Sequence, residues 1–227
     1  MKFSVIIPAA CILFIVLLSA GCTSSPPQVP ETTAPSTPAP TATPAPVASA
    51  FPDALSLGQY ASFGSGDMQG NATVVRAEIR PNFSWSSPSF NSVAEQHSAT
   101  LPNGTELGYN LQTPKAGDEF LFVYIRMLNT GAKAVYAPSP MQFVVHANGM
   151  QYNYTSVHGP DVVIDGVSEG QYDYQIGPGG VVGYIQPGAS NGVNGYLIYE
   201  VPASITPGDA YLVVSLDFQH QAVWKLG

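Results

Sequence analysis

Cysteine is nearly missing from this 227-residue chain: there are two, and both lie within the first 22 residues. Disulfides, thiol nucleophiles and thiolate metal sites are therefore excluded from the rest of the chain. Charge is scarce as well, since only 10% of the residues are charged, with 7 Lys and Arg against 15 Asp and Glu. This acidic balance argues against nucleic acid and anionic membrane surfaces as partners.

Runs of helix-forming residues are also nearly absent. Gly, Pro, Tyr, Asn and Ser are frequent instead, with 22 glycines and 21 prolines, and this is typical of short strands joined by many turns. Residues 51–227 are long enough for one domain that buries about 70% of its unfolded surface. We therefore expect a single β-rich domain over this range.

The N-terminus carries a targeting pattern. Lys2 supplies a positive flank, Phe3 to Leu18 are mostly apolar, and small residues precede the cysteine in Leu18-Ser-Ala-Gly-Cys22. This pattern resembles the signal peptide and lipobox of prokaryotic lipoproteins, which implies that residues 1–21 are removed and that the Cys22 thiol takes a diacylglyceryl group. The alternative is an uncleaved transmembrane helix, although about 16 apolar residues fall just under the roughly 17 to 25 that span a bilayer.

Residues 22–50 are expected to form a lipidated cysteine followed by a disordered stalk. Positions 23–50 hold eight prolines, six threonines, six alanines and four serines, with no aromatic residue and no Leu or Ile to bury. A segment of this composition stays unfolded. Because polyproline II advances about 3.1 Å per residue, the stalk reaches up to roughly 90 Å from the lipid surface.

Alternating apolar residues predict the strands of the domain. From Asn71 to Arg80 a half-buried strand is predicted, with the odd positions facing inward: Thr73, Val75, Ala77 and Ile79. Glu119 to Asn129 is apolar on both faces apart from Arg126, which predicts a central strand. Residues 81–118 are rich in Pro, Ser, Asn and Gly and are expected to be an insertion of loops with a small hairpin. Further strands are expected at residues 195–201, 210–217 and 222–226.

Met141 to Tyr154 predicts a β-hairpin, because Asn148-Gly149 favours a two-residue type I′ turn between two alternating runs. Pairing outward from this turn gives one apolar face made of three pairs: Ala147 with Met150, Val145 with Tyr152, and Phe143 with Tyr154. Asn153 then pairs with Val144 on the opposite, wetter face.

Several of these segments follow a known order. Asp118 to Gly131, Pro187-Gly188 and the strand Gly195-Tyr-Leu-Ile-Tyr-Glu-Val-Pro202 resemble an immunoglobulin-like domain family of unknown function, common in prokaryotic surface lipoproteins and related to secreted immunoprotective antigens. The resemblance implies an all-β, Ig-like antiparallel β-sandwich of about seven strands displayed outside the cell. It transfers no catalytic residue. Residues 81–118 and 157–180 are longer than the loops of that pattern.

Four sequons are N-glycosylation acceptors if the source organism has the machinery, and they begin at Asn71, Asn82, Asn103 and Asn153. An acidic loop also holds four carboxylates that are candidate Ca²⁺ ligands: Asp161, Asp165, Glu169 and Asp173. In the Ca²⁺-loop template, however, Val163 and Tyr172 occupy two positions that need ligands. A solvated acidic loop is the simpler interpretation, and no other cofactor is indicated.

Gly166-Val-Ser168-Glu-Gly170 has the G-x-S-x-G spacing of a nucleophile elbow, and Asp209 or Asp217 with His220 follows in the chain order of a hydrolase triad. That motif needs a strand before the serine and a helix after it, and residues 171–180 predict no helix. With 22 glycines in the chain, a chance match is easy. We therefore expect no enzymatic activity, with an envelope serine hydrolase as the alternative.

Histidine and tyrosine give no clear site. The four histidines are too far apart in sequence to form a zinc motif: His97, His146, His158 and His220. The second half is rich in tyrosines that complete either the core or a sugar- or protein-binding face: Tyr152, Tyr154, Tyr172, Tyr174, Tyr184, Tyr196 and Tyr199.

The sequence thus predicts a non-enzymatic lipoprotein at the outer face of the cytoplasmic membrane of a prokaryote, with an archaeon as one alternative source. The lipid on Cys22 anchors the protein in the membrane. Its domain is expected to serve binding, adhesion or envelope organisation, with an envelope protein or polysaccharide as partner. A Ca²⁺-stabilised binding module is a further alternative.

Overall fold

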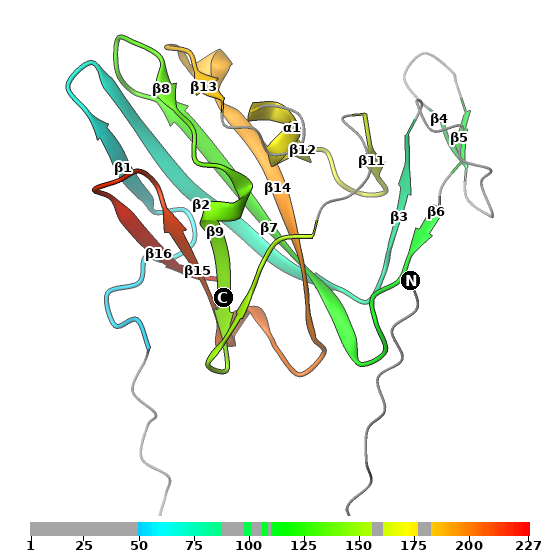
Figure 1. Ribbon diagram of the computed structural model, residues 1–227. Coiled ribbons are helices and arrows are strands. Elements are labelled where there is room, and N and C mark those ends of the chain that lie inside the picture. The colour runs from blue at the N-terminus through cyan, green and yellow to red at the C-terminus, as the bar shows by residue number, and fades with distance from the viewer. Residues whose placement is uncertain (1–49, 88–97, 101–105, 109, 156–160, 177–182) are drawn as a thin grey trace, which may run out of the picture. The chain divides into compact units, whose positions relative to one another are not determined.

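The structure is a computed structural model that describes residues 50–87, 98–100, 106–108, 110–155, 161–176 and 183–227 (Figure 1). The chain divides into two units, Met1–Pro46 and Val47–Gly227, and every described residue belongs to the second. The predicted signal peptide, Cys22 and the stalk up to residue 49 lie outside the described residues. In the described part, no helix is both long and apolar enough to cross a membrane.

Strands dominate the described residues, as the composition predicts. The strands are β1 (Tyr60–Ser65), β2 (Met68–Arg80), β3 (Phe83–Ser86), β4 (Ser98–Thr100), β5 (Glu106–Gly108), β6 (Asn110–Gln112), β7 (Asp118–Asn129), β8 (Val135–Tyr136), β9 (Phe143–Ala147), β10 (Met150–Tyr152), β11 (Val163–Ile164), β12 (Gly170–Gln171), β13 (Tyr184–Ile185), β14 (Val193–Pro202), β15 (Ala210–Ser215) and β16 (Gln221–Lys225). Helical segments are α1 (Tyr172–Ile176) and three 3-10 turns at Pro140–Gln142, Ala189–Asn191 and Pro207–Asp209.

Two sheets form an all-β sandwich. Their strand orders are β1-β2-β7-β14-β12 and β10-β9-β15-β16, and Figure 1 shows the two sheets facing each other. With β2 as strand A and β16 as strand G, these orders correspond to A-B-E-D and C′-C-F-G of immunoglobulin-like sandwiches. The fold class predicted from the sequence is therefore confirmed. One departure is that β12 runs parallel to β14, through Gly170 and Gly195.

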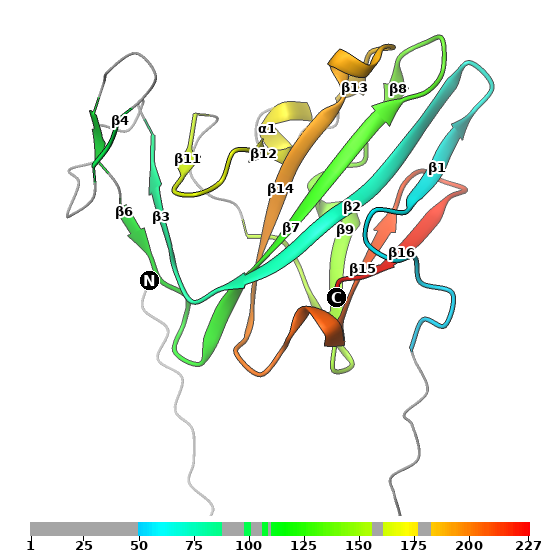
Figure 2. The same cartoon turned by 180° about the vertical axis from the view of Figure 1, so that it is seen from behind.

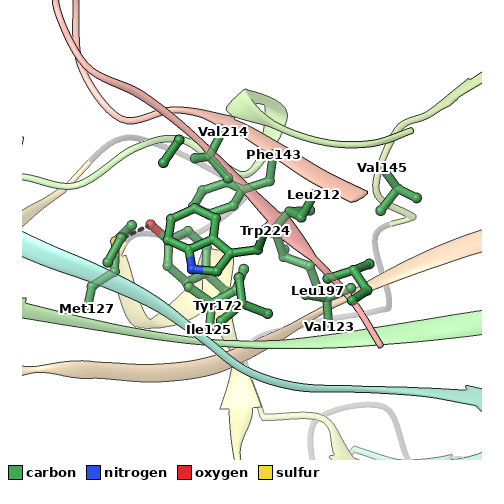
Figure 3. Packing of buried hydrophobic residues seen from close by; sticks show 14 of the residues in the cluster. Val123, Ile125, Met127, Phe143, Val145, Tyr172, Leu197, Leu212, Val214 and Trp224 are labelled. Carbon is green, nitrogen blue, oxygen red and sulfur yellow. Dashed lines mark hydrogen bonds between the residues drawn. The ribbon is translucent and has the colours of Figure 1, made fainter. Parts of the chain in front are cut away.

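The main core lies between these sheets and is drawn in Figure 3. Val123 and Ile125 of β7 meet Val145 of β9, Leu212 of β15 and Trp224 of β16, all of them buried. These residues alternate along their strands with residues of the opposite face, as a half-buried sheet requires. The predicted central strand at 119–129 and the strands at 195–201, 210–217 and 222–226 are thus confirmed as β7, β14, β15 and β16.

A third layer covers the outer face of the first sheet, and this was not predicted. β3 pairs with both β6 and β11, and Phe83 and Ile164 from this small sheet pack on Phe122 of β7 and Tyr196 of β14. Figure 2 shows β2, β7 and β14 from the side away from the second sheet. The small hairpin predicted within residues 81–118 is confirmed by the antiparallel pairs β3–β6 and β4–β5. The interpretation of the stretch as a mere insertion is wrong, because β3, β6 and β11 bury the second apolar face of β7.

Strand β2 changes face halfway along, which corrects the predicted alternation. Ala72 and Val74 point into the main core, and the pairing with β7 then shifts by one residue between Val74 and Arg76. The extra residue of this β-bulge is Val75, which is exposed. A bulge reverses the face on which the following side chains lie, so only the odd positions after it, such as Ala77, face the core as predicted.

The hairpin at Asn148-Gly149 is confirmed, because both residues have positive φ, 50° and 76°, as a type I′ turn requires. Met150 pairs with Ala147 and Tyr152 with Val145, as predicted. The outer pair, Phe143 with Tyr154, is wrong. Tyr154 instead forms a bridge with Tyr199 of β14, so the chain crosses to the other sheet after Tyr152.

A short helix, α1, contradicts the expectation of no helix after Gln171. Tyr172 and Ile176, one turn apart, are both buried in the main core. The Gln175 side chain also bonds both backbone groups of Asn194, at 2.8 and 3.0 Å. Because a helix this short gains its stability from packing rather than from propensity, the local sequence carries little sign of it.

The beginning of the described chain is fastened along the second sheet. Leu55 forms a parallel bridge with Trp224, and its backbone N–H donates to the Val223 carbonyl at 2.8 Å. Phe51 packs on His146 of β9 and Tyr211 of β15, with ring centroids 5.6 and 5.2 Å apart. The described chain is thus held against the second sheet from Phe51 onward, and the domain boundary at residue 51 stays a prediction.

Candidate functional surface

The predicted glycosylation sites differ in accessibility. Asn82 and Asn153 are exposed. Asn71 lies within β2, half-buried, and its side-chain oxygen accepts a hydrogen bond from the Ser62 hydroxyl at 2.9 Å. Asn103 lies outside the described residues. A glycan is thus sterically easiest at Asn82 and Asn153, and the modification itself stays a prediction.

The four carboxylates of the predicted acidic loop are not gathered into one cluster. Asp161 bonds the Ser87 hydroxyl, and Glu169 forms an ion pair with Arg76 at 3.2 Å. The side chain of Asp173 is buried, and burial raises its pKa. No group of three His, Cys, Asp or Glu side chains in the described ranges is arranged to hold a metal ion. Ca²⁺ binding by this loop stays a prediction.

Two arginines of β2 fasten this loop to the outer face of the first sheet. The Arg76 guanidinium stacks 3.4 Å from the centroid of the Tyr124 ring and also reaches Glu169. Arg80 donates to the Asp165 carbonyl at 3.1 Å and pairs with Glu78. One of the four loop carboxylates, Glu169, is therefore paired with an arginine, and the two arginines tie β2 to the segment before α1.

Ser168 and His220, the candidate catalytic pair, have separate partners. The Ser168 hydroxyl donates to Glu169 at 3.1 Å. Ser168 precedes the two-residue strand β12, and α1 begins four residues later, so the strand-serine-helix order of a nucleophile elbow is not formed. Asp209, the other candidate acid, accepts a hydrogen bond from Thr206 at 2.6 Å.

Asp217 and His220 do come together, but in the β15–β16 turn. The His220 ring nitrogen Nδ1 lies 2.8 and 2.7 Å from the two carboxylate oxygens, which also accept the backbone N–H groups of Gln219, His220 and Gly64 at 2.7 to 2.8 Å. Burial opposes the charge, but these hydrogen bonds outweigh it and lower the pKa of Asp217 to about 2. The carboxylate therefore ties the β15–β16 turn to the β1–β2 hairpin.

Replacing Asp217 by asparagine is expected to lower the free energy of unfolding at pH 7 by about 1–2 kcal/mol, because a charged acceptor of several hydrogen bonds is lost. A carboxyl group whose pKa is depressed on folding contributes stability above its unfolded pKa and loses it below. The difference between wild type and variant should therefore shrink as the pH falls from about 4 to 2 in urea titrations. A difference that persists at pH 2 would contradict this role.

Several loops meet at one end of the sandwich, which we call the loop end: residues 65–68, 130–142, 183–192 and 216–220. Hydrogen bonds join them, and the bond from the Gly64 N–H to the Asp217 carboxylate links the two sheets. Lys133 donates its backbone N–H to Asp67 and also forms an ion pair with its carboxylate at 2.9 Å. The Gln142 amide donates to the Ser215 carbonyl at 2.7 Å. Turns far apart in sequence are therefore held together here.

Large apolar side chains are exposed on the loop end. Five are at least half-exposed: Met68, Tyr136, Met141, Tyr184 and Phe218. Tyr136 and Tyr184 are direct partners of the β8–β13 pair, with ring centroids 4.8 Å apart. Phe218 is fully exposed at the tip of the turn that Asp217 fixes. Exposed aromatic side chains on a braced loop are typical of binding surfaces.

The domain begins at the opposite end. Ala50 lies beside Asn148, Gly149 and Asp209, in the turns that close the far ends of β9 and β15, and Figure 1 shows these turns opposite to the β1–β2 and β7–β8 turns. The segment preceding Ala50 therefore joins the domain at the end away from the exposed aromatic side chains.

The predicted tyrosine-rich face is mostly core. Tyr172, Tyr196 and Tyr199 are buried, and Tyr184 is the exposed one that joins the loop end. Its partner Tyr136 and the nearby Phe218 were not singled out from the sequence. Aromatic residues in turn regions rich in Pro and Asn are a weak sign of a binding surface in the sequence. Only the strand pairing shows that these turns lie at the same end of the sandwich.

Comparisons with known proteins leave the family open. No family model matches the chain, and no curated protein matches it. A Bacillus subtilis protein described as a candidate lipoprotein, ycdA, has a solved structure with 13% identity and a TM-score of 0.36, and the match covers 71% of this chain but only 37% of ycdA. The yjhA protein of the same organism has 14% identity and a TM-score of 0.40, with 76% and 99% covered. These scores are too low to establish a shared fold, so membership of the Ig-like family stays a prediction.

Proposed function

We propose that this protein is a lipid-anchored, non-enzymatic surface protein whose domain binds an envelope protein or polysaccharide through its loop end. The observation that carries the proposal is the set of exposed apolar side chains at the end of the sandwich opposite to Ala50. A domain tethered at one end presents its other end to partners, because the tether leaves that end free.

The anchor rests on the sequence. Leu18-Ser-Ala-Gly-Cys22 follows an apolar stretch and resembles the lipobox of prokaryotic lipoproteins. Lipidation of Cys22 places the domain at the outer face of the cytoplasmic membrane. The stalk of residues 23–50 then gives the domain reach without ordering it.

The non-enzymatic part rests on the separation of the candidate catalytic groups. Ser168 contacts Glu169, while His220 contacts Asp217 in a turn that is fixed by the β1–β2 hairpin. A cavity of about 460 Å³ lies along Phe51 and β16, and its lining contains neither Ser168 nor His220. A general base must be within hydrogen-bond reach of its nucleophile. The carboxylate that Ser168 reaches, Glu169, is paired with Arg76, and His220 contacts Asp217 instead of Ser168.

Binding through the loop end is supported by the chemistry of its side chains. Tyr, Phe and Met bury large apolar areas on contact and are enriched among residues that dominate binding energy. The ion pair between Asp67 and Lys133 leaves the surface between them without an unpaired charge. An aromatic surface whose charges are paired or hydrogen-bonded favours an uncharged partner surface, such as a neutral glycan or an apolar protein patch.

The experiment is a binding isotherm of the labelled domain, residues 50–227, on washed cell envelopes of the source organism. The variant Tyr136→Ser/Tyr184→Ser/Phe218→Ser should weaken saturable binding at least tenfold, because each aromatic truncation at a binding centre costs about 2 kcal/mol. Protease or glycosidase treatment of the envelopes tells a protein partner from a polysaccharide.

Matched controls come from the rest of the surface. Met150→Ser/Val75→Ser removes exposed apolar side chains outside the loop end and should leave binding unchanged. In cells, Cys22→Ser should release the full chain from the membrane and leave the binding isotherm intact. Equal loss of binding in both surface variants, or saturable hydrolysis of an envelope component that requires Ser168, would reject the proposal.

A further inference from the structure

We propose that a cavity beside Phe218 binds one neutral pyranose ring of an envelope glycan, an inference that rests on the proposed binding role of the loop end. The cavity measures about 230 Å³, and six residues of two neighbouring turns line it: Gly64, Ser65, Asp217, Phe218, Gln219 and His220. The β15–β16 turn lies beside the β1–β2 hairpin (Figure 2). Pockets for drug-sized ligands have about 300–1,000 Å³, so this cavity suits a single ring.

Phe218 supplies a flat apolar wall. Its side chain is fully exposed, so the faces of the ring are open to a ligand. The face of an aromatic ring carries partial negative charge, and the C–H groups on one face of a pyranose carry partial positive charge. A sugar ring therefore packs well on Phe218.

The carboxylate in the cavity wall selects against a charged ligand. Asp217 accepts three backbone N–H groups, from Gly64, Gln219 and His220, and also contacts Nδ1 of His220. An ionised carboxylate offers about four acceptor positions, so these four donors leave none for a cation. They also fix the turn before binding, which lowers the entropy that a ligand contact must overcome.

His220 supplies a polar group for a hydroxyl. The hydrogen bonds to Asp217 lower its pKa to about 2, so the carboxylate is ionised at pH 7 and Nδ1 of His220 carries a proton toward it. Nε2 is then the ring nitrogen left for a ligand. A sugar hydroxyl both donates and accepts hydrogen bonds, so it matches Nε2 in either protonation state of the ring.

These polar groups favour a sugar over an apolar peptide side chain. The Ser65 hydroxyl and the Gln219 amide are exposed at the same cavity. An apolar side chain packed on Phe218 would cover polar groups of this cavity without replacing their hydrogen bonds to water, which is costly. A pyranose offers an apolar face and hydroxyl groups together, so it matches both parts of the lining.

The test is saturation-transfer difference NMR on the full chain, in a detergent without a sugar headgroup. The probes are the methyl glycosides of glucose, galactose, mannose and N-acetylglucosamine. At least one should receive saturation at its ring protons, with a dissociation constant of about 1 mM, as expected for so small a ligand. His220→Leu should weaken this binding about two- to tenfold, the effect of one lost hydrogen bond.

Two substitutions at Phe218 separate stacking from simple apolar contact. Phe218→Tyr keeps the aromatic face and should bind like wild type, whereas Phe218→Leu keeps apolar volume and should bind at least about fivefold more weakly. Tyr60→Leu makes the same kind of change at an exposed aromatic residue outside this cavity and should leave binding unchanged. Equal binding by Phe218→Leu and wild type would overturn the inference, as would no saturation of any probe up to about 100 mM, well above the expected constant.

The envelope isotherm distinguishes failure of this inference from failure of the proposed function. If Tyr136→Ser/Tyr184→Ser/Phe218→Ser loses envelope binding while Phe218→Leu keeps it, the loop end binds an apolar polypeptide surface. The sugar site is then rejected and the proposed function stands. If the triple variant keeps envelope binding, the proposed function itself fails.

Discussion

Replacing Trp224 by alanine is expected to lower the free energy of unfolding by about 3–5 kcal/mol, the range for removing a buried aromatic side chain. The Trp224 side chain lies between the sheets with only 1% of its surface exposed (Figure 3). Its indole N–H donates to the Gln59 carbonyl at 2.9 Å, and its backbone faces Leu55. The substitution therefore opens a cavity in the main core and also removes the indole hydrogen bond to the segment before β1.

Urea denaturation followed by far-UV circular dichroism measures this loss without relying on tryptophan fluorescence. Trp224→Phe keeps most of the apolar contact but not the indole N–H, so it should fall between wild type and Trp224→Ala. Val75→Ala, at the exposed bulge of β2, should change stability by less than about 0.5 kcal/mol. A loss below 1 kcal/mol for Trp224→Ala would mean that the main core is packed differently.

The sequence predicts those strands whose own residues show an alternating or continuous apolar pattern. β7 and β14 pair along ten residues, from Val193 with Met127 to Pro202 with Asp118, and both have long apolar runs in the sequence. The turn at Asn148-Gly149 is equally local, because its positive φ angles follow from the residue types. In these places the sequence dictates the structure directly, and the prediction is confirmed.

The remaining features depend on contacts between distant residues. The bulge in β2 cannot be located from the sequence because Val74 and Val75 are both valine, and either fits the inward position. The third layer is built from very short strands, and β3 pairs with β11 about 80 residues further along, through Trp85 and Ile164. Strands this short give almost no periodic signal, so only the long-range pairing defines them.

The candidate surface is predictable only in part. The sequence singles out Ser168, His220 and the acidic loop because motifs are recognised along the chain. In the structure, Ser168 bonds Glu169, His220 bonds Asp217 within a turn, and Glu169 of the acidic loop pairs with Arg76. The loop end is assembled from four turns, and no motif spans it. Tyr136 and Tyr184 become neighbours through the β8–β13 pair, which joins residues almost 50 positions apart. Such a surface appears only after the fold is known.

Replacing Phe122 by alanine is expected to open the third layer and to lower the free energy of unfolding by about 3–5 kcal/mol. Phe122 of β7 is fully buried on the outer face of the first sheet. Its ring lies 5.3 Å from Phe83 of β3 and 5.8 Å from Tyr196 of β14, and the Arg80 guanidinium covers it at 4.9 Å. Removing the ring takes away one of the two aromatic contacts that Phe83 makes with β7 and leaves the one with Phe120 at 4.9 Å.

Hydrogen exchange distinguishes this loss from a general one. Amide protection measures local opening as well as global unfolding, so the amides of Phe83 to Ser86 in β3 should lose protection in Phe122→Ala before those of β9 and β15. In Trp224→Ala, by contrast, protection should fall across both sheets, because the main core joins them. If Phe122→Ala lowers protection uniformly, the third layer unfolds together with the sandwich. In that case β3, β6 and β11 are part of one cooperative core rather than a cover that opens on its own.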